Sequence, residues 1–134
     1  MKTLNPYLNF AGNCEEALNF YQQCFNGKIE TMKSFSEAGM DVPENWKDKI
    51  CHAEFRVEDI YFMASDGMDP TPIKPNNAVT LSINFTDLNE QETIFNALAE
   101  GGNIIMPLKD TFWNARFGML ADKFGVNWMF NCDL

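Results

Sequence analysis

The chain carries an internal repeat with an offset of 75 residues. The segment that starts at Leu8 is LNFAGNCEEALNFYQQCFNGKIE, and it aligns with the segment that starts at Ile83, INFTDLNEQETIFNALAEGGNII. Identical residues stand at Asn9 and Asn84, Phe10 and Phe85, Glu15 and Glu90, Phe20 and Phe95, Gly27 and Gly102, and Ile29 and Ile104. Because these matches extend over a strand, a helix and a closing glycine, the sequence indicates a duplicated module.

Each half of the repeat predicts a strand, an amphipathic helix and three further strands. Apolar residues recur at helical spacing in both helices, at Ala17, Leu18, Tyr21, Cys24 and Phe25 in the first and at Ile94, Phe95, Leu98 and Ala99 in the second. Strand patterns follow at about 28–35, 50–57 and 60–65, and again at about 103–108, 117–121 and 126–131. The predicted order is therefore β-α-β-β-β, twice.

Short local motifs predict where the two helices begin and end. Asn13 with Glu16, and Asn89 with Glu92, have the spacing of a capping box, in which the first side chain caps the helix. Glycines that can adopt a left-handed conformation follow both helices, at Gly27 and at Gly101–Gly102.

Two segments have the pattern of neither helix nor strand. Residues 66–77, DGMDPTPIKPNN, are rich in turn-forming proline and asparagine and are predicted to link the two modules. Residues 36–49, which include Pro43 and Trp46, form a long polar connection, and loops of that length are often functional.

The predicted fold class is α+β. A helix on one side of a mainly antiparallel sheet leaves the other face of that sheet bare, and two such modules can cover their bare faces together. We therefore expect paired βαβββ modules that form a curved, half-open eight-stranded sheet with helices on the outside and a concave cavity. The whole chain, 1–134, is predicted to be a single domain, with modules at about 1–65 and 78–134.

Composition and charge narrow the possible functions. The chain is 46% hydrophobic and 22% charged, which is typical of a globular domain. Its net charge of −9 repels phosphate backbones, so no nucleic-acid partner is expected. No apolar stretch approaches the roughly 20 residues that span a bilayer, so no membrane partner is expected either. The start of the sequence lacks a signal-peptide pattern, so we expect a cytoplasmic protein.

The cysteines and the common catalytic motifs give little support for specific chemistry. The four cysteines Cys14, Cys24, Cys51 and Cys132 include no C-x-x-C pair, and we expect buried or half-buried reduced thiols in preference to bridges. The sequence has no G-x-S-x-G, P-loop or G-x-G-x-x-G motif, so hydrolase, nucleotidase and dinucleotide-binding interpretations lack support. A glycine-rich loop for a methyl donor is not formed by Gly12, Gly39 or Gly67.

Three segments of the sequence resemble a known family. They are PYLNFAGNCEEALNFY, HAEFRV and DTFWNARFGMLADKFGVNW, and together they extend over nearly the whole chain. The chain resembles the vicinal oxygen chelate superfamily of glyoxalases, bleomycin-resistance proteins and extradiol dioxygenases. Within it, the chain is similar to the PhnB-like branch, described as 3-demethylubiquinone-9 3-methyltransferase-like. The resemblance implies paired βαβββ modules, a homodimer and, in many members, a divalent metal held by four side chains.

The residues at the family's metal positions do not have the chemistry of metal ligands. The resemblance places those positions near Asn5 or Pro6 and at Met63, Thr80 and Met129. Divalent ions prefer carboxylate or imidazole ligands, which none of these residues supplies. We therefore predict no cofactor and no metal at the usual site, and the methionines instead indicate a soft apolar pocket.

His52, the only histidine, is the strongest candidate for acid–base chemistry. Strand alternation in CHAEFRV places His52, Glu54 and Arg56 on one face of the strand. In the functional interpretation His52 is a general base or a lone metal ligand, with Glu54 beside it. In the structural interpretation His52 is a hydrogen-bonded residue on a sheet face, and Arg56 pairs with Glu54.

The segment before the last two strands allows two interpretations. In the functional one, Trp113 stacks on a flat ligand and Arg116 binds the carboxylate or phosphate of that ligand. In the structural one, Arg116 holds the loop through Asp122 or Asp110 and the aromatic residues fill the core. Phe124, Trp128 and Phe130 are expected in the core or the cavity wall.

The sequence thus favours a PhnB-like, glyoxalase-fold protein that binds a small, partly apolar molecule in the concave cavity without the four-ligand metal site. The alternative is a metal-dependent lyase, isomerase or dioxygenase with an unconventional site near His52 and Glu54. The expected ligand contacts are Tyr7, Asn9, Met63, Thr80, Trp113, Arg116 and Met129.

Overall fold

The computed structural model describes residues 1–67 and 78–134. The chain divides into two compact units, Met1–Ile73 and Lys74–Leu134. The first unit contains β1 (Tyr7–Asn9), α1 (Cys14–Phe25), β2 (Lys28–Ser34), a 3₁₀ turn (Glu44–Trp46), β3 (Ile50–Val57) and β4 (Ile60–Ser65). The second contains β5 (Leu81–Phe85), α2 (Leu88–Ala99), β6 (Asn103–Asp110), β7 (Ala115–Ala121) and β8 (Asn127–Asp133). The predicted duplication of βαβββ modules is confirmed.

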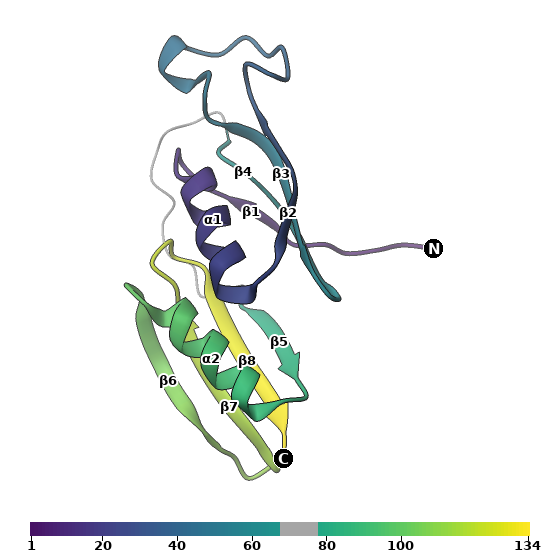
Figure 1. Ribbon diagram of the computed structural model, residues 1–134, viewed down its shortest axis with the longest axis vertical. Helices are drawn as coiled ribbons and strands as arrows, with labels where there is room; N and C mark the ends of the chain where they lie inside the picture. Colours follow the sequence, from purple (N-terminus) through teal and green to yellow (C-terminus); the bar gives the residue numbers. More distant parts are fainter. Residues whose placement is uncertain (68–77) are drawn as a thin grey trace. The chain divides into compact units, whose positions relative to one another are not determined.

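The two units have the same sheet topology (Figure 1). The strand order is β1-β4-β3-β2 in the first sheet and β5-β8-β7-β6 in the second. The first strand of each unit pairs with the last in parallel, and the other neighbours are antiparallel. Both sheets are therefore mixed and open, which confirms the α+β class, with the strands in two four-stranded sheets.

The core of the first unit lies between α1 and one face of its sheet. The predicted apolar stripe of α1 is buried, as are the sheet residues Ala53, Phe55, Phe62 and Ala64. Phe55 and Phe62 stack with their ring centroids 4.9 Å apart, and Tyr21 meets Phe62 edge-on. Because alternate residues point to opposite faces, the residues between these buried ones lie on the face that α1 does not cover.

The core of the second unit is built in the same way beneath α2. Phe95 of α2 packs edge-on against Phe130 of β8, with ring centroids 5.4 Å apart. Trp128 and Phe130 are buried, which agrees with their expected place in the core, whereas Phe124 is only half-buried. Gln91 is also fully buried in this core, which the apolar spacing of the helix did not predict.

The predicted capping boxes are wrong at both helices. Asn13 precedes α1, but its side chain makes no capping hydrogen bond. In the second unit the cap is Asp87 and not Asn89, because the Asp87 carboxylate accepts hydrogen bonds from the backbone N–H groups of Asn89 and Glu90. A short acidic side chain two residues earlier satisfies the free donors of the first turn, so the helix begins there.

The start of α1 is capped by a residue distant in the sequence. Asp66 Oδ1 accepts hydrogen bonds from the backbone N–H groups of Gly12 and Cys14, both at 2.9 Å. Asp66 Oδ2 accepts a third from the N–H of Ile50 at 2.7 Å. One buried carboxylate thus joins the start of α1, the start of β3 and the end of β4.

Asp122 has a similar role in the hairpin between β7 and β8. Its Oδ1 atom accepts hydrogen bonds from the backbone N–H groups of Phe124 and Val126, at 2.8 and 3.1 Å. Its Oδ2 atom accepts one from Nε1 of Trp128 at 2.9 Å. Asp122 therefore fixes the turn and the core tryptophan.

Helix α1 ends with a left-handed residue one place before the predicted one. Asn26 adopts a φ of 54°, which asparagine tolerates better than most residues. Gly27 is needed for another reason, because a Cβ atom there would lie 2.5 Å from Cζ of Phe55. In the second unit Gly101 does adopt the expected positive φ, 75°.

The long connection between β2 and β3 folds around Trp46. The Trp46 side chain is buried in a small cluster with Phe35 and Val42, and Cys51 packs against it. Trp46 Nε1 donates a hydrogen bond to the carbonyl of Gly67 at 2.8 Å. This loop is therefore a structured part of the first unit. The predicted linker, 66–77, lies outside the described residues except for Asp66 and Gly67.

The four cysteines are free thiols, as expected. Cys14, Cys24 and Cys132 are buried and Cys51 is half-buried. Burial, and then the nearby charges of Asp66 and Glu15, raise the pKa of the Cys14 thiol far above its ordinary value. That thiol therefore stays protonated at neutral pH. No helix in the described ranges is long and apolar enough to cross a bilayer.

Candidate functional site

The face of the first sheet that α1 leaves uncovered carries a group of polar side chains. Strand pairing places Glu54 of β3 opposite Met63 of β4, and Met63 opposite Tyr7 of β1. Arg56 lies opposite Tyr61 in the same register. Directly opposed residues share a face, so three strands bring these side chains together.

His52 joins this group through two contacts, which form what we call the His52 network (Tyr7, His52, Glu54 and Tyr61). Nδ1 of His52 is 3.1 Å from the hydroxyl oxygen of Tyr7. Nε2 of His52 is 3.4 Å from Oε2 of Glu54. The other carboxylate oxygen of Glu54 accepts a hydrogen bond of 2.7 Å from the hydroxyl of Tyr61. Four side chains from three strands thus form one connected chain of polar contacts.

Arg56 does not pair with Glu54, in contrast to the structural interpretation of the sequence. Nε of Arg56 donates to Oε1 of Glu30 on β2 at 2.9 Å, and its guanidinium carbon lies 4.5 Å from the ring centroid of Tyr61. Arg56 therefore supports the Tyr61 ring and leaves the Glu54 carboxylate to His52 and Tyr61.

The contacts within the network change the proton affinities of two members. The hydrogen bond from Tyr61, and then the contact with His52, lower the pKa of Glu54 in spite of partial desolvation. The same hydrogen bond raises the pKa of Tyr61, because the carboxylate stabilises the protonated phenol. At neutral pH Glu54 is therefore an acceptor and Tyr61 a donor.

Replacing Tyr61 with phenylalanine should raise the pKa of Glu54 towards its ordinary value, because the largest stabilising contact of the carboxylate is lost. Since the folded-state pKa lies below the unfolded one, the Glu54 contacts stabilise the fold above the unfolded pKa, and this contribution disappears as the pH falls through the folded pKa. A carbon-13 NMR titration of the Glu54 carboxyl measures the change. An unchanged Glu54 pKa in Tyr61→Phe would contradict the assignment.

The candidates Asn9 and Thr80 lie in different units of the chain. Asn9 is the last residue of β1, where it pairs with Ser65, and its side chain is exposed. Thr80 immediately precedes β5 in the second unit and is half-buried. Neither residue belongs to the His52 network.

In the second unit, Trp113 lies on the sheet face that α2 leaves uncovered. Its Nε1 atom donates to Oδ1 of Asn131 at 3.3 Å, and its ring meets that of Phe117 edge-on at 5.6 Å. Phe117 pairs with Asn131, and Met119 pairs with Met129, so these four residues share one face. Trp113 is 49% exposed.

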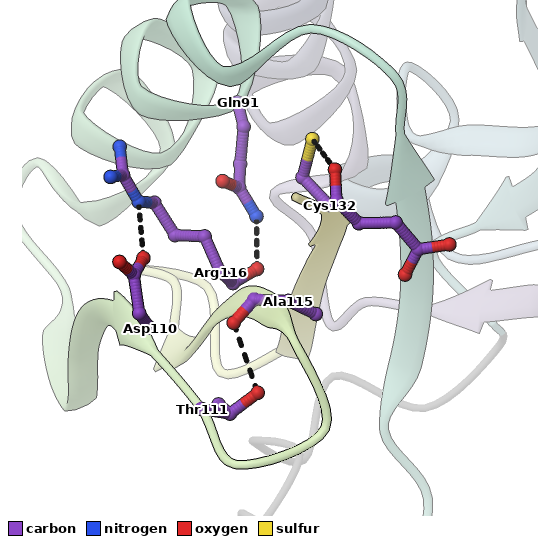
Figure 2. A network of polar contacts seen from close by, with 7 residues as sticks. Gln91, Asp110, Thr111, Ala115, Arg116 and Cys132 are labelled. Carbon is purple, nitrogen blue, oxygen red and sulfur yellow. Dashed lines mark hydrogen bonds and ion pairs between the residues drawn. The ribbon is translucent and has the colours of Figure 1, made fainter.

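Arg116 lies on the opposite, helix-covered side of the same sheet. It pairs with Cys132 of β8, and its Nε atom is 3.3 Å from Oδ1 of Asp110. Figure 2 shows the Arg116 side chain beside Asp110, while its backbone carbonyl accepts a hydrogen bond of 2.9 Å from Gln91. The structure therefore does not bring Trp113 and Arg116 together, and it selects Asp110 over Asp122 as the partner of Arg116.

A shallow groove of about 490 Å³ lies next to Arg116, between α2 and β6. Phe95 and Leu108 form part of its apolar wall, and Glu92, Lys109 and Asp110 add charges of both signs. All the residues that line the groove belong to the second unit, whereas the His52 network belongs to the first.

The donor atoms at the family's metal positions do not fit a divalent ion. Met63 and Met129 offer only thioethers, and Thr80 only a hydroxyl. Among the described residues, no group of three or more His, Cys, Asp or Glu side chains lies close enough to hold a metal ion. His52 and Glu54 give two ligand atoms, and Nδ1 of His52 is already in contact with Tyr7. Catalytic zinc sites use three protein ligands.

The comparison with known sequences decides the family. The model of the family described as 3-demethylubiquinone-9 3-methyltransferase matches residues 2–130. The chain belongs to this family. A structure of protein PA1353 from Pseudomonas aeruginosa is 44% identical over 99% of this chain and 98% of its own, with a TM-score of 0.86. A putative 3-demethylubiquinone-9 3-methyltransferase, PhnB protein, from Bacillus cereus is 30% identical over 98% and 99% of the two chains, with a TM-score of 0.82.

The wider fold also agrees with the resemblance found in the sequence. The fosfomycin resistance protein FosX from Listeria monocytogenes has a TM-score of 0.68 over 100% of this chain and 94% of its own. At 11% identity, this likeness shows the fold alone. This chain is thus a PhnB-like protein with the glyoxalase and bleomycin-resistance fold.

Tyr61 is the site residue that the sequence interpretation missed. It alternates with the buried Phe62 and stands opposite Arg56 across the sheet. Strand alternation predicts that Tyr61 lies on the face opposite Phe62, but the hydrogen bond to Glu54 follows only from the register between β3 and β4.

Proposed function

We propose that this PhnB-like protein binds a small, partly apolar molecule on the sheet faces that its helices leave uncovered. The observation that carries the proposal is the His52 network. Its side chains are half-exposed and hydrogen-bonded to one another, so they offer donors and acceptors that are already oriented for a ligand. Tyr7, the outermost member, is 41% exposed.

The second unit supplies an apolar surface of the kind that flat ligands prefer. Trp113, Phe117, Met119 and Met129 share its uncovered face. Aromatic rings and thioethers adapt to apolar groups of varied shape. Taken by itself, this face suits a molecule with an aromatic or thioether part, and the face with the His52 network suits a molecule with one or two oxygen atoms.

A thermal-shift screen of aromatic and thiol-bearing small molecules tests this function. Compounds that raise the melting temperature are then titrated by calorimetry into the native protein and into the variants Tyr7→Phe and His52→Gln. Loss of one hydrogen bond should weaken binding about fivefold, which corresponds to about 1 kcal/mol.

Arg116→Ala is the matched control, because Arg116 lies in the other unit on the helix-covered side of its sheet. Its affinity for a bound compound should equal that of the native protein. If Arg116→Ala loses binding and the two network variants do not, the groove beside α2 is the binding site and the proposed site is wrong.

The second candidate function is a metal-dependent lyase, isomerase or dioxygenase centred on His52 and Glu54. The observation in its favour is that an imidazole nitrogen and a carboxylate oxygen lie 3.4 Å apart on a half-exposed face. Elemental analysis of protein purified without chelators separates the two candidates. Stoichiometric metal that is lost in His52→Ala would favour the enzyme, and metal-free protein that binds a compound would favour the first proposal.

We also propose that the protein is a homodimer. Strand β6 is an edge strand, and it exposes Ile104, Ile105 and Met106. Exposed apolar edges are commonly covered by association. Sedimentation equilibrium should give twice the mass of the chain, and Ile105→Asp should shift the protein towards the monomer. A monomeric native protein would refute the proposal.

A further inference from the structure

We propose that Tyr7, His52 and Glu54 form an acid–base site in which the phenol oxygen of Tyr7 exchanges a proton with the bound molecule. This inference rests on the proposed function and deepens it, because it assigns a chemical step to the His52 network. It depends on the order of contacts along the network, which runs from an exposed hydroxyl through an imidazole to a carboxylate.

The contacts determine which nitrogen of His52 carries the proton. A carboxylate only accepts hydrogen bonds, so the imidazole nitrogen that faces Glu54, Nε2, carries the hydrogen. In the neutral ring Nδ1 is then an acceptor, and the hydroxyl of Tyr7 donates to it at 3.1 Å. Glu54 is itself held in place by the hydroxyl of Tyr61 at 2.7 Å.

Tyr7, His52 and Glu54 are arranged in the way that activates a hydroxyl group. A base lies within hydrogen-bonding distance of the hydroxyl, and a third group orients the base. Tyr7 belongs to the edge strand β1 and is the most exposed of the three, so its oxygen is the atom that meets a ligand. Tyr7 is thus the catalytic residue, and His52 and Glu54 act through it as positioning residues.

The step conserves protons and electrons. The hydroxyl proton of Tyr7 passes to Nδ1 of His52, and the Tyr7 oxygen takes a proton from the ligand in its place. The ligand keeps the electron pair of the broken bond, and the imidazolium is stabilised by the Glu54 carboxylate 3.4 Å away. The reverse transfer returns a proton to the ligand at the same or a neighbouring atom. No oxidant or reductant is required.

The strength of the base indicates the class of substrate. Proton transfer is efficient when the two groups have similar proton affinities. A phenol oxygen that passes its own proton to an imidazole therefore suits the more acidic carbon and oxygen acids, such as 1,3-dicarbonyl compounds and enols.

The test uses N-acetylimidazole, which acetylates tyrosine oxygens, and needs no natural ligand. The acetyl group bonds to the tyrosine oxygen, the phenol proton passes to the base, and imidazole leaves with a proton from solvent. Mass spectrometry of the digested peptides measures the acetylation rate of each tyrosine. Tyr7 should react faster than Tyr61, whose hydroxyl is held by Glu54. In His52→Gln the Tyr7 rate should fall at least about tenfold, because general-base assistance is lost.

Two further variants and one spectrum complete the experiment. Glu54→Gln should also lower the acetylation rate of Tyr7. Arg56→Gln should leave that rate unchanged, because Arg56 contacts the Tyr61 ring and Glu30. Because His52 is the only histidine, its ring nitrogens give unique NMR signals, and neutral His52 should carry its proton on Nε2.

A proton on Nδ1, or a Tyr7 acetylation rate that is unchanged in His52→Gln, would overturn the proposal. If the hydrogen bond between Tyr7 and His52 is only structural, the acetylation rate of Tyr7 should be the same in His52→Gln as in the native protein. The ligand screen is a separate measurement, so an activated Tyr7 in a protein that binds none of the screened compounds would count against the proposed function and not against the acid–base site.

Discussion

Asp66→Ala should lower the free energy of unfolding by at least about 3 kcal/mol. The carboxylate is 1% exposed and accepts three backbone hydrogen bonds, from Gly12, Cys14 and Ile50. Each buried donor left without a partner costs about 1–3 kcal/mol. Urea denaturation followed by circular dichroism measures the loss.

Two control variants test whether the loss of stability is specific to the Asp66 carboxylate. Asp66→Asn keeps one acceptor oxygen and should lose less than Asp66→Ala. Asp41→Ala removes an exposed carboxylate from the same unit and should change the unfolding free energy by less than about 0.5 kcal/mol. Equal stability of Asp66→Ala and the native protein would show that Asp66 does not hold α1 to the sheet.

Trp128→Ala should cost about 3–5 kcal/mol of stability, the usual cost of removing a large core side chain. Its ring is buried at 1% exposure, and its Nε1 atom donates to Asp122 in the hairpin turn. Trp113→Ala, in the turn between β6 and β7 of the same unit and half-exposed, should cost no more than about 1 kcal/mol.

The two tryptophans therefore form a matched pair, since they are the same residue type in the same unit. The unfolding free energies of the two variants, measured in parallel by denaturation, show which tryptophan ring belongs to the core, and no ligand needs to be known. A loss of several kcal/mol in Trp113→Ala would show that the Trp113 ring is part of the core and would remove it from the candidate ligand contacts.

Much of the fold is predictable from the sequence because its signals are local or repeated. The helical spacing of apolar residues correctly predicted α1 and α2. The bounds predicted for β3 and β4 coincide with those observed. Strand alternation also placed His52, Glu54 and Arg56 on one face, which the register between β3 and β4 confirms for Glu54 and Arg56 and the contact with Glu54 confirms for His52. These features depend only on residue spacing within one element.

The sequence interpretation went wrong where a contact joins distant residues or crosses a turn. Asn13 stands in the usual place of a cap, but the acceptor for α1 comes from Asp66, 52 residues away from Cys14. Trp113 and Arg116 are close in the sequence, yet Asn114 adopts a φ of 63° between them. Side chains three residues apart point to opposite faces of a strand, and Trp113 indeed lies on the face of Phe117 and Asn131, whereas Arg116 lies on the face that α2 covers.

The two helices of the duplicated module are capped in different ways, and this difference affects the order of folding. The Asp87 cap of α2 lies next to the helix, so that helix can be stabilised as soon as its first turn forms. The cap of α1 requires closure of a loop of about fifty residues, which has a larger entropic cost and a slower rate. Pulse-labelling hydrogen exchange during refolding should therefore show the first-turn amides of α2 protected earlier than the amide of Cys14.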